Sequence, residues 1–80
     1  MATLSARALA SLLSGWRGPG AVPAYGALAD RIRLLVLDGR IPLGTRIPAE
    51  RELAAQLGVS RTTVTAAYGE LKDAGYLTSL

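Results

Sequence analysis

The chain has 80 residues and a formal net charge of +3, and it contains neither cysteine nor histidine. A chain this short forms one small domain, and the missing residue types exclude disulfides, most zinc sites and the Ser-His and Cys-His pairs of nucleophilic catalysis. Eight of the nine basic residues are arginine, which suits bidentate contacts with phosphate and guanine, although the same charge would also keep a small domain soluble.

The first 16 residues predict a short amphipathic helix. Ser5 is a suitable N-cap, and apolar side chains follow at helical spacing at Leu9, Leu12, Leu13 and Trp16. The only early charge is Arg7, and Ser11 interrupts the apolar run, so a signal peptide is disfavoured. The stretch is also too short to span a membrane. We expect this helix to dock on another surface, which can lie outside this chain.

Residues 17–24 hold two glycines and two prolines and predict a linker. It divides an N-terminal region, residues 1–24, from the main domain, residues 25–80. Residues 25–38 then predict the first core helix, with its apolar stripe at Tyr25, Leu28, Ala29, Ile32, Leu35 and Val36. Leu34 and Leu37 widen this apolar surface, which indicates either a thoroughly buried helix or a face that meets a partner.

A loop is predicted for residues 40–48, with turn signals at residues 42–44. Ile41 and Ile47 are expected to form a short edge segment that pairs with the end of the chain. Residues 76–80 are rich in β-prone side chains and predict the first strand of a hairpin.

Two helices separated by a very short turn are the most informative feature. Glu50–Leu57 is predicted as the first, with acidic residues in its first turn. Residues 60–74 are predicted as the second, with one apolar stripe at Val64, Ala67, Tyr68 and Leu71. The turn between them contains Gly58, and Val59 is expected to fill the corner. This arrangement is typical of a helix-turn-helix.

The start of the second helix is polar on its outer face. Ser60 is the predicted N-cap, and Arg61, Thr62, Thr63 and Thr65 follow it. In a helix-turn-helix, this end of the second helix meets base edges and phosphates in the major groove. Tyr68 lies on the apolar stripe instead, and we expect it to pack in the core.

The sequence from residue 25 to residue 80 resembles the winged helix-turn-helix of GntR-type transcriptional regulators. The similar residues are 40–54 (RIPLGTRIPAERELA), 57–64 (LGVSRTTV), 67–68 (AY), Leu71 and 75–77 (GYL). The resemblance implies a mainly α fold, with a three-helix winged helix-turn-helix, a truncated β-wing and a short preceding N-terminal helix.

Trp16, the Gly-Pro linker and residues 25–29 resemble the MocR branch of that family. In this branch the DNA-binding domain precedes a large aminotransferase-like domain that holds pyridoxal phosphate. The resemblance therefore implies that the chain is the N-terminal part of a longer protein, with the cofactor outside it.

The same resemblance implies three arginine contacts with DNA. Arg61, in the first turn of the recognition helix, would be the chief base reader and bind guanine through its guanidinium. Arg51, on the preceding helix, would reach a phosphate or a guanine, unless it is paired on the surface with Glu50 or Glu70. Arg46, in the loop before that helix, would touch the DNA backbone.

Hydroxyl side chains are implied to complete the interface. Ser60, Thr62 and Thr63 would donate to phosphates and fix the register. Thr65 stands where some relatives carry a longer basic side chain, so it reaches less far, although it can touch a base methyl.

Two departures from the family pattern are visible. Ala49 stands where many relatives have an N-capping serine, so Glu52 lacks its capping-box partner and the helix start loses about 1 kcal/mol. The Gly-rich hairpin that enters the minor groove in the family is not part of these 80 residues.

We therefore expect a sequence-specific binder of double-stranded DNA in a bacterial, cytoplasmic transcription factor. It would act as a homodimer in its full-length form, without a membrane partner, metal or catalytic residue in this chain. The alternative is a helix-turn-helix used as a protein-protein interaction module, with Leu34, Leu37 and the N-terminal helix as its interface. An enzymatic function is the least supported, because no nucleotide loop and no cluster of carboxylates is present.

Overall fold

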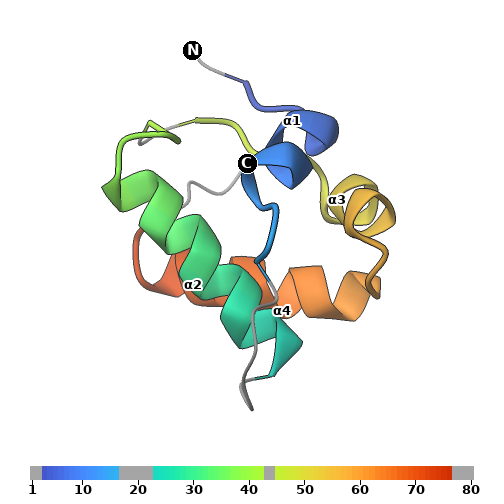
Figure 1. The fold of residues 1–80 in the computed structure, drawn as a ribbon. Helices are drawn as coiled ribbons and strands as arrows, with labels where there is room; N and C mark the ends of the chain where they lie inside the picture. Colours follow the sequence, from blue (N-terminus) through green and yellow to red (C-terminus); the bar gives the residue numbers. More distant parts are fainter. Residues whose placement is uncertain (1–2, 17–22, 43–44, 77–80) are drawn as a thin grey trace.

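The computed structural model describes residues 3–16, 23–42 and 45–76, and these residues form four α-helices and no extended strand (Figure 1). The helices are α1 (Ala6–Leu12), α2 (Ala24–Leu37), α3 (Glu50–Leu57) and α4 (Arg61–Asp73). The mainly α fold class is confirmed, with three helices of a helix-turn-helix domain and a shorter one before them.

Local signals explain where the helices begin and end. The hydroxyl of Ser5 accepts a hydrogen bond from the backbone N–H of Ala8 at 3.1 Å and caps α1. After α4, Gly75 adopts a left-handed conformation with φ of 84°. The N–H of Tyr76 then reaches the carbonyl oxygen of Leu71 at 2.9 Å, so that the last carbonyls of the helix are paired.

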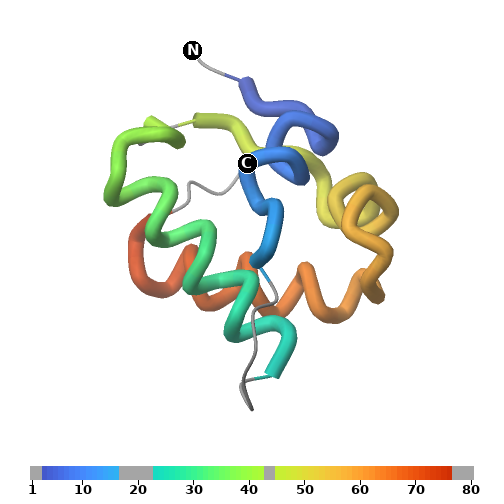
Figure 2. Tube along the Cα trace, in the orientation of Figure 1, coloured from blue at the N-terminus to red at the C-terminus, as the bar shows by residue number. Residues whose placement is uncertain are grey.

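The core is built around α4. Both α2 and α3 pack against α4, and α1 packs against α3 (Figure 2). All four helices contribute to one cluster of buried apolar side chains, which includes Leu9, Leu13, Leu28, Ile32, Leu53, Val64, Tyr68 and Leu71. Because α4 has neighbours on two sides, its remaining face is the one presented outward.

The surface on which the N-terminal helix docks lies within this chain. Leu9 and Leu13 are completely buried, and Leu12 and Trp16 are half-buried against the same cluster. The two leucines are four residues apart and therefore share one side of α1. Residues 17–22, which contain most of the predicted linker, lie outside the described residues.

The segment around Arg46 pairs with the start of the chain. Arg46 forms a parallel bridge with Thr3, and the N–H of Leu4 donates to the Arg46 carbonyl oxygen at 2.9 Å. Ile41 is buried, and its N–H is bound to Leu35 at the end of α2. The N-terminal segment therefore pairs with this stretch, whereas the expected pairing with residues 76–80 stays a prediction, because residues 77–80 lie outside the described residues.

Part of the apolar surface of α2 is open to solvent. Leu34 is 47% exposed and Leu37 is 62% exposed, and Tyr25, expected in the buried stripe, is 39% exposed. The interpretation of α2 as a thoroughly buried helix is therefore wrong at these three positions. The other members of the stripe are buried as predicted.

Candidate nucleic-acid interface

The turn between α3 and α4 has the geometry that the sequence predicts. Gly58 ends α3 in a left-handed conformation, with φ of 70° and ψ of 32°, which a residue with a side chain rarely adopts. The N–H of Val59 donates to the Ala54 carbonyl oxygen at 3.1 Å, and its side chain is partly buried against the core. The corner therefore fixes the direction in which α4 leaves α3.

Ser60 caps α4. Its hydroxyl accepts from the backbone N–H of Thr63 at 3.2 Å and lies 3.0 Å from the Thr63 hydroxyl. Capping satisfies one of the free N–H groups in the first turn. Thr63 is therefore engaged with the cap and only half-exposed, whereas Thr62 is exposed.

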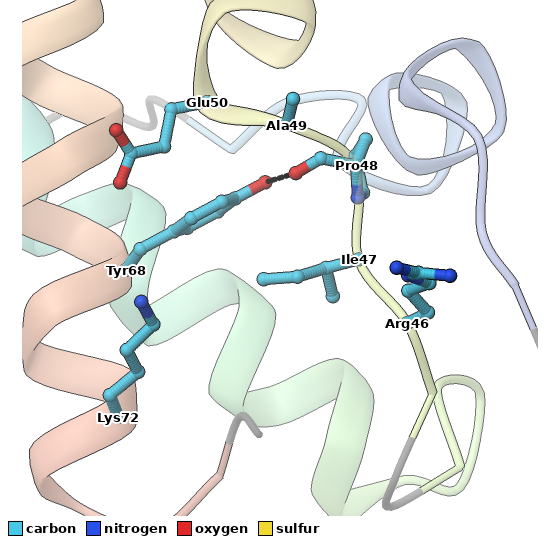
Figure 3. Close-up of a pocket in the computed structure, with 7 residues that line it drawn as sticks. All are labelled: Arg46, Ile47, Pro48, Ala49, Glu50, Tyr68 and Lys72. Atoms are coloured by element: carbon cyan, nitrogen blue, oxygen red, sulfur yellow. Dashed lines mark hydrogen bonds between the residues drawn. The ribbon is translucent and has the colours of Figure 1, made fainter. Parts of the chain in front are cut away.

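The inner face of α4 is held by packing and by one long-range hydrogen bond. Val64, Ala67, Tyr68 and Leu71 are buried, as predicted. The Tyr68 hydroxyl donates to the Pro48 carbonyl oxygen at 2.9 Å, across the gap between α4 and the segment before α3 (Figure 3). Burial, and to a smaller extent the Glu50 carboxylate, raises the pKa of the Tyr68 phenol well above its ordinary value.

The outer face of α4 carries exposed polar side chains at Arg61, Thr62 and Thr65. Arg51 is also exposed, and together with Arg61, Ala49 and Glu50 it lines an open hollow of about 310 Å³. The structure thus brings the two predicted arginine readers to one place, from two different helices.

Arg46 is not part of that group. It lines a second open hollow of about 380 Å³ with Glu50, Tyr68, Lys72 and three residues of the segment that leads into α3 (Figure 3). The two hollows share Ala49 and Glu50. Arg46 therefore does not share a hollow with Arg51 and Arg61.

The residue whose contacts the sequence did not predict is Glu50, which was assigned to the helix dipole or to a surface pair with Arg51. One of its carboxylate oxygens accepts a hydrogen bond from the Thr65 hydroxyl at 2.8 Å. The same oxygen lies 3.8 Å from Nε of Arg61. Glu50 therefore faces Arg61 and Thr65, and within the described residues Arg51 makes no ion pair with it. No spacing signal could have found this contact, since Glu50 and Thr65 belong to different helices.

The described residues contain neither a helix long and apolar enough to cross a membrane nor a metal-binding group of three or more Asp or Glu residues. Ala49, at the N-cap of α3, makes no side-chain capping hydrogen bond, which agrees with the expected loss of the capping box.

Comparisons with known proteins agree with this geometry. The family described as bacterial regulatory proteins, gntR family, matches residues 24–80. The chain is 45% identical over 58 residues to the HTH-type transcriptional regulator Rv0792c of Mycobacterium tuberculosis, a match that covers 72% of this chain and 22% of that protein. It is 47% identical over 57 residues to Rv1152 of the same organism, covering 66% of this chain and 47% of the relative.

A third relative is MocR of Rhizobium meliloti, named as a probable rhizopine catabolism regulatory protein. It is 41% identical over 58 residues, covering 72% of this chain and 12% of the relative. The chain thus spans less than half the length of each of these relatives. No solved structure gives a significant match. The family match extends over all three helices of the helix-turn-helix domain, and the chain belongs to the gntR family of bacterial regulatory proteins.

Proposed function

We propose that this chain is the part of a bacterial transcriptional regulator that reads a specific sequence of double-stranded DNA, with α4 in the major groove. The observation that carries the proposal is the two-sided character of α4. Its inner face is buried, whereas Arg61, Thr62 and Thr65 on its outer face are exposed near the helix N-terminus. A helix presented in this way places short polar side chains and one guanidinium against base edges.

Arg61 is the proposed base reader. Its side chain is 69% exposed, so its guanidinium is free to bind O6 and N7 of a guanine. Arg51, which shares a hollow with Arg61, reaches a neighbouring phosphate or guanine. Ser60, Thr62 and Thr63 position the helix on phosphates, and Arg46 contacts the backbone farther along.

Further proposals concern the whole protein. The chain covers 12% of MocR, which supports a longer regulator. By its resemblance to the MocR branch, we propose that an aminotransferase-like domain with pyridoxal phosphate follows this chain. Two copies of such a protein in the cytoplasm would present two reading helices to two half-sites. The cofactor would lie in the further domain and takes no part in DNA contacts here.

The alternative function, a protein-protein interaction module, has one observation in its favour. Leu34 and Leu37 are exposed three residues apart on α2. The other half of that interface is not accessible, because Leu9 and Leu13 of α1 are buried in the core. DNA binding therefore remains the function that the arrangement supports best.

Binding to a random pool of duplex DNA at two salt concentrations, followed by selection of enriched sites, tests the proposal. A specific reader recovers a sequence motif and binds less tightly at higher salt, since contacts with phosphates release counterions. Binding that yields no motif and does not respond to salt would contradict the proposal and favour the interaction module.

A further inference from the structure

Glu50 is the one carboxylate among the residues that line the two hollows beside α4. The basic residues there are Arg46, Arg51, Arg61 and Lys72. A negative charge in this position repels DNA phosphates, so it weakens generic attraction at the centre of a basic surface. Because the Glu50 carboxylate lowers the affinity for DNA in general, we looked to its contacts for another role in DNA binding.

The contacts of Glu50 indicate that role. One oxygen accepts from the Thr65 hydroxyl at 2.8 Å and lies 3.8 Å from Arg61 Nε. The Glu50 side chain is 27% exposed, whereas that of Arg61 is 69% exposed. The carboxylate is thus partly fixed in the protein while the guanidinium extends outward from it. Figure 3 shows the carboxylate directed from α3 toward α4, beside the Tyr68 ring.

We propose that Glu50 is a specificity-determining positioning residue, which orients Arg61 and Thr65 toward bases and discriminates against generic phosphate contacts. The proposal rests on the proposed function. A carboxylate that attracts Arg61 through Nε leaves both terminal nitrogens of the guanidinium for the O6 and N7 acceptors of guanine. It also holds a flexible side chain in one direction, so less freedom is lost on binding.

The same contact favours the role that the resemblance implies for Thr65. Its hydroxyl donates to Glu50, so Thr65 presents a methyl group to a base instead of a hydrogen bond to a phosphate. A threonine methyl packs against the methyl group of thymine. Glu50 thereby selects the kind of contact made at two of the predicted reading positions.

A matched pair of variants separates this role from a simple change of charge. Glu50→Gln keeps the size of the side chain and an oxygen that can accept from Thr65, but it removes the attraction to Arg61. Glu52→Gln removes the same charge from the same first turn of α3, and Glu52 is exposed and makes no side-chain contact of this kind within the described residues. Both variants lose the same interaction with the helix dipole.

The measurement is the ratio of affinities of the 80-residue chain for an enriched duplex and for a random duplex. Glu50→Gln should bind random duplex more tightly and lower this ratio by about fivefold or more, since a well-placed guanidinium is the main source of base discrimination. Glu52→Gln should tighten binding to both duplexes alike and leave the ratio unchanged.

A readout in the free chain isolates the contact itself. In nitrogen-15 spectra, the Arg61 Nε–H resonance should shift in Glu50→Gln and stay in place in Glu52→Gln. If Glu50→Gln changes neither this resonance nor the affinity ratio more than Glu52→Gln does, Glu50 does not position Arg61 and the inference is overturned. If the wild-type chain itself shows no salt-dependent binding to duplex DNA, the proposed function fails, and this inference fails with it. If the wild-type chain binds but the two variants behave alike, only this inference fails.

Discussion

The Tyr68 hydroxyl donates a hydrogen bond of 2.9 Å to the carbonyl oxygen of Pro48, twenty residues earlier in the chain. This bond ties the middle of α4 to the segment that leads into α3. Tyr68 is 4% exposed and belongs to the core, so its side chain both fills space in the core and pairs a backbone carbonyl. The orientation of the outer face of α4 depends on such anchors.

Removal of this hydroxyl should weaken the fold. Tyr68→Phe leaves the Pro48 carbonyl without its partner, and we expect the free energy of unfolding to fall by about 1 kcal/mol. Urea denaturation measures this loss. Tyr25→Phe is the control, because Tyr25 is partly exposed and its hydroxyl has no hydrogen bond within the described residues. An equal effect of the two substitutions would contradict the anchoring role.

Alkaline pH should remove the same contribution. The pKa of Tyr68 is raised in the folded chain, first by burial and then by Glu50. A raised folded pKa means that the contribution is complete below the unfolded value of about 10 and is lost as pH rises toward the folded value. The stability difference between wild type and Tyr68→Phe should therefore shrink above pH of about 10. A difference that stays constant or grows in denaturation at alkaline pH would show that the phenol is not held neutral by the fold.

The first turn of α3 should accept a better cap. Ala49 is the N-cap without a side-chain hydrogen bond, and Glu52 stands at the third position of the helix. Ala49→Ser completes a capping box and should raise the free energy of unfolding by about 0.5 to 1 kcal/mol. Ala55→Ser, at an exposed position in the interior of α3, should instead lower it slightly, because serine is a poorer helix former. Equal thermal shifts for the two variants would exclude a capping effect.

The N-terminal helix should be necessary for the stability of the domain. Leu9 is completely buried, so Leu9→Ala should cost about 2 to 4 kcal/mol. Leu37→Ala removes the same atoms from a side chain that is 62% exposed, and we expect a change within about 0.5 kcal/mol. If Leu9→Ala proved as mild as Leu37→Ala in chemical denaturation, α1 would not be part of the folded core.

Sequence signals placed α3 and α4 because those signals are local. Gly58 and Ser60 fix the turn through backbone conformation and capping, and both lie next to the positions that they control. Glu50–Leu57 was predicted with the bounds that the structure has, and residues 60–74 enclose α4 together with its two caps. The seven predicted DNA contacts stay predictions, which depend on where α4 lies on a duplex.

Contacts between distant segments were not predictable in the same way. The pairing of Thr3 with Arg46, and the packing of α1 on α3, depend on how the chain folds back on itself. The link from Glu50 to Thr65 joins two helices whose relative position is set by the core. Periodicity describes one face of one helix, so it does not specify which polar side chains of two helices meet.

Replacement of Arg61 tests the central claim most directly. Arg61→Ala and Arg31→Ala each remove one arginine, but Arg31 is exposed on α2, which contributes no predicted DNA contact. Arg61→Ala should abolish the preference of the chain for the enriched duplex over random DNA. Its affinity for the enriched duplex should fall by about 1 to 3 kcal/mol, or roughly five- to 150-fold. Arg31→Ala should change the affinity for both duplexes by about twofold or less, as expected for a charge remote from the contact surface. If Arg61→Ala kept both the affinity and the sequence preference of the wild type, α4 would not be the recognition helix.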